Sequence, residues 1–198
     1  MTQAVKNCRS FNPKAQIYDA LQSLLAERGM NLSSVTISEV AERAEIGRAT
    51  FYRHFDTLAD VLKWQTEREV QDAINTQPLD EGNYYLFAKS FYDYWTKHDR
   101  LPEILAKTST SEFFLSAMQN YLSKVGEHLL VHAALPPYYK NYIVPIWSET
   151  MWSILKSWIL NGKTETSKEL ADITYRVFYL PPQTDPTMLR SSRRRASK

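Results

Sequence analysis

Apolar residues recur at intervals of three and four along most of the chain, and no segment alternates apolar and polar positions as a half-buried strand would. The first such stretch begins with Asn12 and Pro13, a helix cap followed by a proline, and Gly29 supplies its stop. Similar caps and stops predict about nine helices, beginning near Pro13, Ile37, Arg48, Leu58, Tyr84, Pro102, Phe114, Ile143 and Thr166. The pattern therefore predicts an all-α fold.

Composition divides this row of helices into two domains and a tail. Residues 10–64 are expected to form a small domain of three helices, and aromatic residues crowd into the larger helical body expected over residues 65–181. Pro145 either begins or kinks the eighth helix of that body. Residues 182–198 include the run Arg193-Arg194-Arg195 and are expected to be a disordered basic tail.

The second and third helices are short and are joined by about three residues, which is the layout of a helix-turn-helix. Phe51 and Phe55 lie four residues apart and are expected to face inward. The positions left to face outward are Arg48, Ala49, Thr50, Tyr52, Arg53 and His54. Arginine binds guanine and hydroxyl groups hold phosphates, so these residue types suit DNA. By spacing alone, a solvated helix face in an ordinary bundle fits equally well.

Charge and cysteine content narrow the class of protein. The net charge is +2 and the single cysteine, Cys8, has no internal partner, which favours a reducing compartment. We find no membrane span and no signal-peptide core, so we expect a cytoplasmic protein without membrane partners.

His128 and His132 have metal-ligand spacing, but no acid or cysteine completes a site. Without a phosphate loop or nucleophile motif, we expect no enzyme, no cofactor and no metal.

The segment "TISEVAERAEIGRATFYRHFDTLADVLK", residues 36–63, resembles the DNA-binding signature of the TetR/AcrR family of bacterial transcriptional regulators. The segment "MWSILKSWILNGKTETSKELADI", residues 151–173, more weakly resembles the family's regulators of dihydroxyacetone utilisation. The first resemblance implies a homodimer on a pseudo-palindromic operator, with one third helix in each half-site. It implies phosphate contacts from Thr36, Ser38, Tyr52 and His54, and base contacts from Arg48, Ala49, Thr50 and Arg53.

This chain departs from the family pattern at two positions. Glu45 occupies a turn position where the family usually has glycine, and a left-handed conformation there costs about 1 kcal/mol. Leu58 replaces the lysine that usually binds a phosphate near the start of the fourth helix. The dipole and backbone N–H groups of that helix start are expected to retain some phosphate affinity.

The aromatic body is expected to hold a small-molecule effector, although ordinary core packing explains any single aromatic residue more simply. The predicted pocket residues are Phe87, Phe91, Tyr92, Trp95, Phe114, Met118, Tyr121, Trp147 and Met151. A second apolar stripe is predicted to form a two-fold dimer seam through Trp152, Leu155, Ile159, Ile173 and Val177.

Two functions from different classes follow from these patterns. The first is a ligand-responsive repressor that leaves its operator when a small molecule binds. The second is a relative that has lost operator binding and acts as a protein-interaction adaptor or coactivator, which the replacement of lysine by Leu58 motivates.

Overall fold

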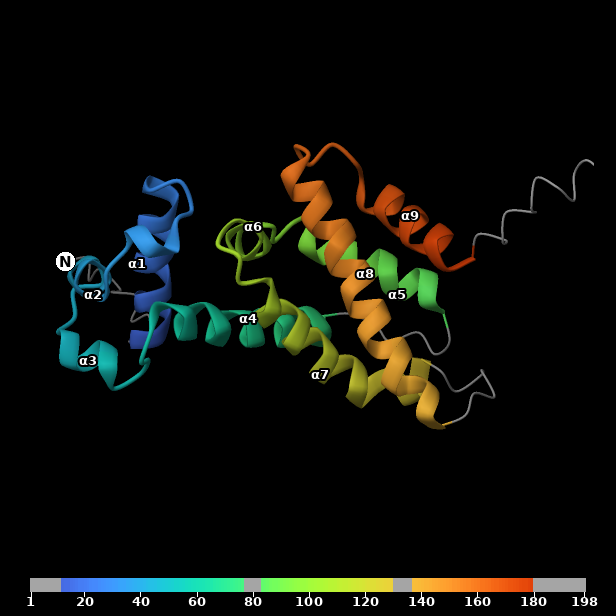
Figure 1. Cartoon of the computed structure of the whole chain (residues 1–198), viewed down its shortest axis with the longest axis horizontal. Coiled ribbons are helices and arrows are strands. Elements are labelled where there is room, and N and C mark those ends of the chain that lie inside the picture. The colour runs from blue at the N-terminus through green and yellow to red at the C-terminus, as the bar shows by residue number, and fades with distance from the viewer. Residues whose placement is uncertain (1–11, 77–82, 130–136, 180–198) are drawn as a thin grey trace, which may run out of the picture.

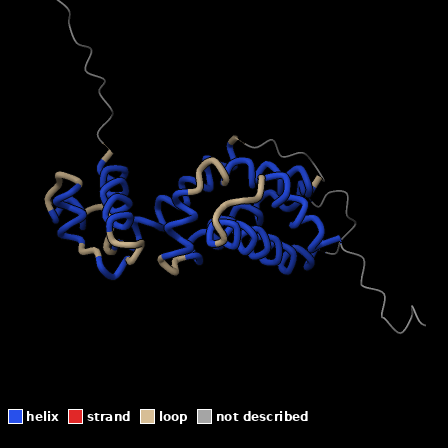
Figure 2. The backbone as a smooth tube through the Cα atoms, turned by 90° about the horizontal axis from the view of Figure 1, so that it is seen from above, coloured by secondary structure: helices blue, strands red, loops and turns tan. Residues whose placement is uncertain are grey.

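The computed structural model describes residues 12–76, 83–129 and 137–179, and within these ranges it contains helices and loops without a strand. Figure 1 shows the whole chain, and Figure 2 shows the same helices from above. The all-α prediction is confirmed over the described residues. The α-helices are α1 (Pro13–Glu27), α2 (Ile37–Arg43), α3 (Arg48–Tyr52), α4 (Leu58–Asn75), α5 (Tyr84–Trp95), α6 (Arg100–Lys107), α7 (Ser111–Leu129), α8 (Lys140–Leu160) and α9 (Ser167–Tyr179). Two 3-10 turns cover Leu32–Ser34 and Pro137–Tyr139.

Four helices begin where the cap residues indicate. The Asn12 side chain accepts hydrogen bonds from the first turn of α1. Thr36 and Thr57 each form a capping box with the acidic residue three positions later, at the starts of α2 and α4. Thr166 makes the same reciprocal bonds with Glu169 before α9. Short-range side-chain chemistry thus sets these helix starts.

Helices α1 to α3 form a unit at one end of an elongated molecule, and α5 to α9 form the body at the other (Figure 1). Helix α4 leads from the unit into the body and packs against both α1 and α7. The expected domain boundary after residue 64 therefore falls within a continuous helix. A displacement of α4 would therefore change the packing of both the N-terminal unit and the body.

The core of the N-terminal unit is built from apolar faces at helical spacing. Ile17, Leu21 and Leu25 of α1 are fully buried, as are Phe51 of α3 and Leu62 of α4. Helices α2 and α3 are short and bury few residues, so the unit depends on α1 and α4 to complete its core.

The core of the body is aromatic. Helix α5 packs mainly against α9, and α7 packs against α8 and α4. At the centre, the Phe114 ring lies 5.0 Å from the Trp95 ring and 4.6 Å from the Trp152 ring, measured between centroids. These contacts join α5, α7 and α8 through a single side chain.

Three helix starts differ from the sequence predictions, and helix α7 begins at Ser111 rather than Phe114. Helix α6 begins at Arg100 rather than Pro102, which places the proline within the first turn, where its missing N–H costs little. Helix α8 begins at Lys140 and passes through Pro145. Pro145 is therefore inside the helix, and the Ser148 hydroxyl donates to the carbonyl oxygens of Val144 and Pro145.

An ion-pair cluster fastens α6 to the turn between α8 and α9. Lys163 Nζ donates to Asp99 Oδ2 at 2.7 Å and to Glu103 Oε2 at 2.9 Å, and Lys107 also binds Glu103. Lys163 has a φ of 60° and follows Gly162, whose φ is 96°. Hydrogen bonds from Lys107 and Lys163 lower the pKa of Glu103. The left-handed turn thus places one lysine between two carboxylates.

None of the described helices combines the length and apolar composition needed to cross a membrane. The expected basic tail, residues 182–198, lies outside the described residues.

Candidate nucleic-acid interface and effector body

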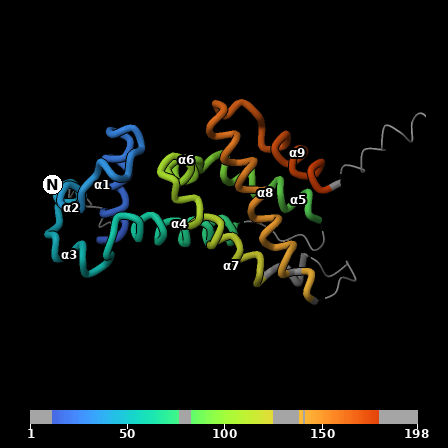
Figure 3. Tube along the Cα trace, in the orientation of Figure 1, coloured from blue at the N-terminus to red at the C-terminus, as the bar shows by residue number. Residues whose placement is uncertain are grey.

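Helices α2 and α3 form a helix-turn-helix at the end of the molecule away from the body (Figure 3). The turn is closed by hydrogen bonds from the N–H of Glu45 to the Glu42 carbonyl and from the N–H of Ile46 to the Ala41 carbonyl, each 3.0 Å. Glu45 has a φ of 54°, the left-handed conformation expected at this position. The turn therefore keeps its geometry without glycine, at a cost of about 1 kcal/mol.

The residues of α3 divide into an inward pair and an outward row. Phe51 is fully buried and Phe55 is 6% exposed, as predicted. Six residues make up the outward row: exposed Arg48, Ala49, Tyr52 and Arg53, and half-buried Thr50 and His54. The structure thus leaves the predicted base- and phosphate-contacting residues of α3 and of the turn that follows it at least partly accessible.

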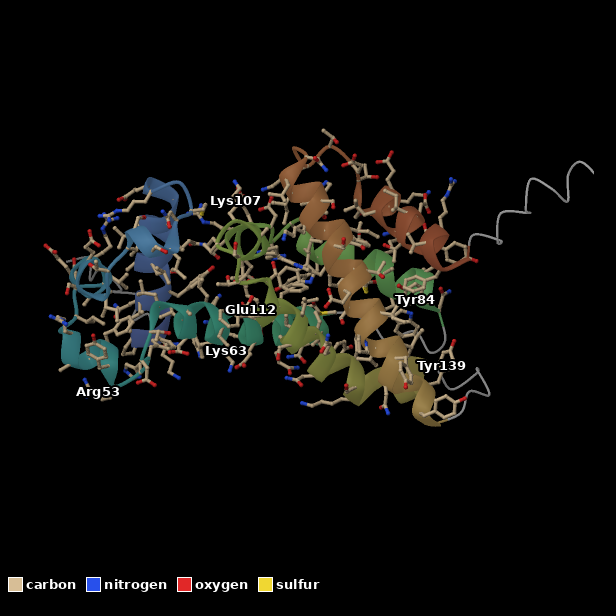
Figure 4. The ribbon with its side chains drawn as sticks, in the orientation of Figure 1. Arg53, Lys63, Tyr84, Lys107, Glu112 and Tyr139 are labelled. Atoms are coloured by element: carbon tan, nitrogen blue, oxygen red, sulfur yellow. The ribbon has the colours of Figure 1, made fainter. Side chains whose placement is uncertain are left out.

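Arg53 is held in place by its own helix. Its Nη2 donates to Thr50 Oγ1 at 3.1 Å, and Figure 4 shows the side chain at the outer end of the N-terminal unit. A guanidinium oriented by a neighbour loses less side-chain entropy when it binds a base edge or a phosphate. Thr50 therefore acts here as a support for Arg53.

The cations of the N-terminal unit fall into two groups. Arg43 binds Glu27 at 2.8 Å and Arg28 pairs with Glu39, so both tie α2 to preceding segments. Arg48 and Arg53 form no ion pair with another described residue. Their charges are thus available to an anionic partner.

The two residues predicted to contact phosphate at the start of α2, Thr36 and Ser38, differ in whether their hydroxyl groups are already hydrogen-bonded. The Thr36 hydroxyl and backbone N–H both donate to Glu39 Oε2, at 2.7 Å and 2.8 Å. These bonds, together with the Arg28 ion pair, lower the pKa of Glu39. Ser38 is exposed. A phosphate at this helix start would therefore meet Ser38 rather than the occupied hydroxyl of Thr36.

The start of α4 is similarly occupied. Asp60 accepts from the backbone N–H and hydroxyl of Thr57, both at 2.8 Å, and Leu58 packs against the core. A carboxylate in the first turn offsets the positive end of the helix dipole. This arrangement opposes the phosphate affinity expected for this helix start.

An aromatic support behind α3 was missed by the sequence analysis. The Phe55 ring lies 5.9 Å from the Trp64 ring of α4, and Lys14 Nζ of α1 lies 5.5 Å and 5.8 Å from these two rings. Such a contact depends on how α1 and α4 pack, so no local spacing in the sequence reveals it.

All nine predicted pocket residues are buried, with exposures of 9% or less. Of these nine, Tyr121 lines a cavity that is bounded by described residues. That cavity has a volume of about 150 Å³, lies between α4 and α7, and is lined by Glu67, Val70, Gln71, Ile74, Ala117, Asn120, Tyr121 and Lys124. A cavity of about 490 Å³ lies over α4 and α5, and one of about 260 Å³ over α8 and α9.

The predicted dimer seam needs a correction. Three of its residues are buried inside the single chain, because this face of α8 packs against other helices of the body: Trp152, Leu155 and Ile159. Ile173 and Val177 of α9 are exposed, as a seam requires. The outward face of α8 instead carries Ile146, Ser153, Ser157 and Leu160, which the sequence analysis did not select.

A partly buried carboxyl group lies where α4 enters the body. Gln65 Nε2 donates to Glu69 Oε1 at 2.7 Å, and burial raises the pKa of Glu69. His98 and Arg68 oppose this rise, and Asp72 adds to it. Glu69 in turn contributes, after burial, to a raised pKa of Tyr18 on α1. The carboxyl therefore acts electrostatically on both the body and the N-terminal unit.

Glu69→Gln is expected to stabilise the protein at pH 7. In the folded chain the ionised carboxylate is disfavoured, so stability falls as the pH rises from the ordinary pKa of 4.5 through the raised one. Glutamine keeps the acceptor for Gln65 and removes this loss. Urea unfolding should show a gain above the roughly 0.5 kcal/mol typical of surface substitutions.

The same measurement on Glu67→Gln provides the control, because Glu67 is exposed on the same helix. The gain of Glu69→Gln should shrink as the pH falls through the raised pKa toward 4.5 and be nearly absent below 4.5. A gain that is equal at pH 7 and pH 4 would contradict the assigned burial effect.

In the part of the chain that the structure describes, no three histidine, cysteine, aspartate or glutamate side chains gather as a metal site. His132 lies outside that part, so the spacing of His128 and His132 gains no structural support.

Residues 17–63 match the family model described as bacterial regulatory proteins, tetR family. No curated protein matches the chain in a sequence comparison.

Solved structures resemble it over most of its length. Lin0861 from Listeria innocua has a TM-score of 0.71 at 17% identity, covering 91% of this chain and 97% of its own. A TetR-like transcriptional regulator from Rhodococcus sp. RHA1 has a TM-score of 0.55 at 15% identity, covering 90% and 98%. The dihydroxyacetone kinase operon activator DhaS has a TM-score of 0.57 at 19% identity, covering 83% and 93%.

At these identities the structural likeness shows the fold, and the family match covers the helix-turn-helix. Residues 17–63 thus resemble the N-terminal domain of tetR-family bacterial regulatory proteins, and most of the chain shares the fold of these solved structures.

Proposed function

We propose that this protein is a ligand-responsive transcriptional repressor that binds a pseudo-palindromic operator as a homodimer. The observation that carries the proposal is the outward row of α3 and its C-cap, where Arg48 and Arg53 are accessible and pair with no acidic side chain of the described residues. A helix presented by a helix-turn-helix enters the major groove, and arginine is the side chain that most often reads guanine there.

Two copies are needed because one short helix reads only one half-site. The exposed face of α8 and α9 supplies a surface for two-fold packing, with apolar Ile146, Ile173 and Val177 beside small Ser153 and Ser157. Small residues allow helices to approach closely, and an isologous contact pairs the same face on both copies.

Control by a ligand is proposed to act through α4. This helix contacts α7 beside the 150 Å³ cavity and also contacts α1 of the N-terminal unit. A molecule bound in the body would favour the arrangement of α4 that best accommodates it. Half-sites about 34–36 Å apart would then no longer match the two reading helices.

Selection from a random DNA pool tests the proposal, followed by fluorescence anisotropy at several salt concentrations. Arg48→Ala should weaken the selected operator by about 10- to 100-fold and relax the base preference at one position. Tyr52→Phe should weaken all sequences alike, because it removes a hydroxyl that would bind phosphate.

Lys97→Ala is the matched control, since it removes an exposed cation from the turn that follows α5 and should leave operator affinity within twofold. If the selection enriched no DNA sequence and binding did not depend on salt, the proposed regulator function would be rejected. That outcome would favour the protein-interaction adaptor instead, a function that Leu58 and the acidic start of α4 also fit.

A further inference from the structure

A lysine of α1 lies beside the C-terminal end of the reading helix. Lys14 Nζ lies 5.5 Å from the centroid of the Phe55 ring and 5.8 Å from that of the Trp64 ring. Phe55 comes two residues after Arg53, and Trp64 belongs to α4. The ammonium group therefore lies where α1, the end of α3 and α4 meet. Figure 3 shows these three segments together at one end of the molecule.

This lysine keeps its charge available. Lys14 forms no ion pair with another described residue. Arg68 lies 5.7 Å from the same Trp64 ring, but it pairs with Asp72. A ring face attracts an ammonium group without neutralising it, because the ring carries no net charge. Lys14 thus has a preferred place over the two rings and can still bind an anion.

The neighbouring start of α4 supplies no cation of its own. Leu58 packs against the core, and Asp60 carries a negative charge that Thr57 holds in the first turn. A phosphate that approached the exposed segment between Phe55 and α4 would meet this acid and no lysine or arginine from the first turn. A cation at this end of α3 comes instead from α1, as Lys14.

The position of Lys14 suits the backbone of DNA. The major groove is about 12 Å wide, close to the diameter of a helix with its side chains, so segments flanking a reading helix approach the phosphates. Ser38 precedes α3 and Lys14 lies beyond its C-terminal end, so each flank has a residue that can hold a phosphate. Such contacts fix the orientation of the protein without reading the sequence.

We infer that Lys14 binds a DNA phosphate beside the C-terminal end of α3, held there by the rings of Phe55 and Trp64. This inference rests on the proposed operator binding and assigns a contact to α1, outside the helix-turn-helix. An ammonium group already placed over two rings loses less side-chain freedom when it binds than a freely solvated lysine does. Lys14 therefore contributes affinity for any DNA sequence and no preference among bases.

Lys14→Met tests this, because methionine keeps an unbranched apolar side chain over the rings and removes the charge. Anisotropy is measured on the full chain with the selected operator and with a scrambled duplex, between about 50 and 200 mM KCl. The slope of log Kd against log salt concentration should become less steep by about 0.9 for each bound chain, hence about 1.8 for a dimer. Affinity for both duplexes should fall by the same factor, about 3- to 30-fold.

Arg68→Met is the matched control, since it removes a cation from the same Trp64 ring, one turn of α4 nearer the body. It should leave the slope unchanged. Lys14→Arg keeps the charge and should also retain the wild-type slope. Urea unfolding of each variant separates a lost contact from lost stability, because unfolding lowers the active fraction without changing the number of ions that each bound chain releases.

A second substitution tests where the phosphate lies. In the Lys14→Met background, Leu58→Lys places an ammonium group three residues after Phe55, at the start of α4. It should restore the slope and return the affinity to within about threefold of wild type. Leu58→Gln is the comparison variant and should restore neither, because it adds a polar side chain without a charge.

A Lys14→Met slope equal to that of wild type would overturn the inference, as would a loss of affinity confined to the selected operator. Failure of Leu58→Lys to recover the slope in a stably folded double variant would overturn the position given to the phosphate. Absence of sequence-specific DNA binding by the wild type rejects the proposed function itself. Specific binding by the wild type, with an unchanged slope in Lys14→Met, rejects only the contact from Lys14.

Discussion

Replacing Phe51 with alanine is expected to destabilise the N-terminal unit by about 3–5 kcal/mol, since it removes a fully buried ring from a small core. The centroid of the Phe51 ring lies 5.7 Å from that of Tyr52 and 6.1 Å from that of Phe55. Both neighbouring rings would therefore lose an aromatic packing contact. Operator affinity should fall by more than about 100-fold, because unfolding of α3 removes the outward row as a whole.

Urea unfolding followed by circular dichroism measures the loss of stability, and anisotropy measures the loss of affinity. Tyr52→Ala provides the control for stability, because Tyr52 is 48% exposed on the same helix and should cost less than about 1 kcal/mol. Equal destabilisation by the two changes would show that Phe51 does not anchor α3.

Ile173→Arg is expected to split the proposed dimer. Ile173 is 43% exposed on α9, and a charge at the two-fold seam would face its own copy across the interface. A monomer engages one half-site at a time, so operator affinity should fall by about 100-fold or more through lost avidity. Sedimentation velocity should show a dimer for the wild type and a monomer for the variant.

Leu86→Arg is the matched control, as it adds the same charge at a 40%-exposed leucine on α5. It should remain dimeric and keep its affinity. If Ile173→Arg also remained dimeric, the proposed interface on α8 and α9 would be wrong. If the wild type itself sedimented as a monomer, the proposed homodimer would be lost.

Between them, these two changes separate the parts of the proposed mechanism. The first removes the reading helix and leaves the seam, while the second removes the seam and leaves the helix. The loss of operator affinity is therefore accompanied by a loss of stability in Phe51→Ala and by a change of oligomeric state in Ile173→Arg.

Much of the fold follows from local chemistry in the sequence. The Thr36–Glu39 and Thr57–Asp60 capping boxes form because both partners lie within one helical turn. The inward direction of Phe51 and Phe55 follows from their spacing of four residues, and the same geometry turns Arg48 and Arg53 outward. The left-handed conformation of Glu45 was implied by the family resemblance, which places glycine there, and not by local spacing.

The use of the apolar stripes was decided only by the tertiary structure. Periodicity showed that α8 is apolar on more than one face, but a stripe looks the same whether its own body or a second copy covers it. Packing of α5 and α7 against α8 placed Trp152 and Leu155 inside and left Ile146 outside.

Long-range contacts likewise had no local signal. Lys163 meets Asp99 across 64 residues, and Lys14 reaches Phe55 and Trp64 only because α1 and α4 cross. The sequence by itself determined where the capped helices α1, α2, α4 and α9 begin and which side of α3 faces outward, because those depend on neighbours within a turn. Only tertiary packing decided which polar groups stay unpaired inside, because that depends on every helix around them.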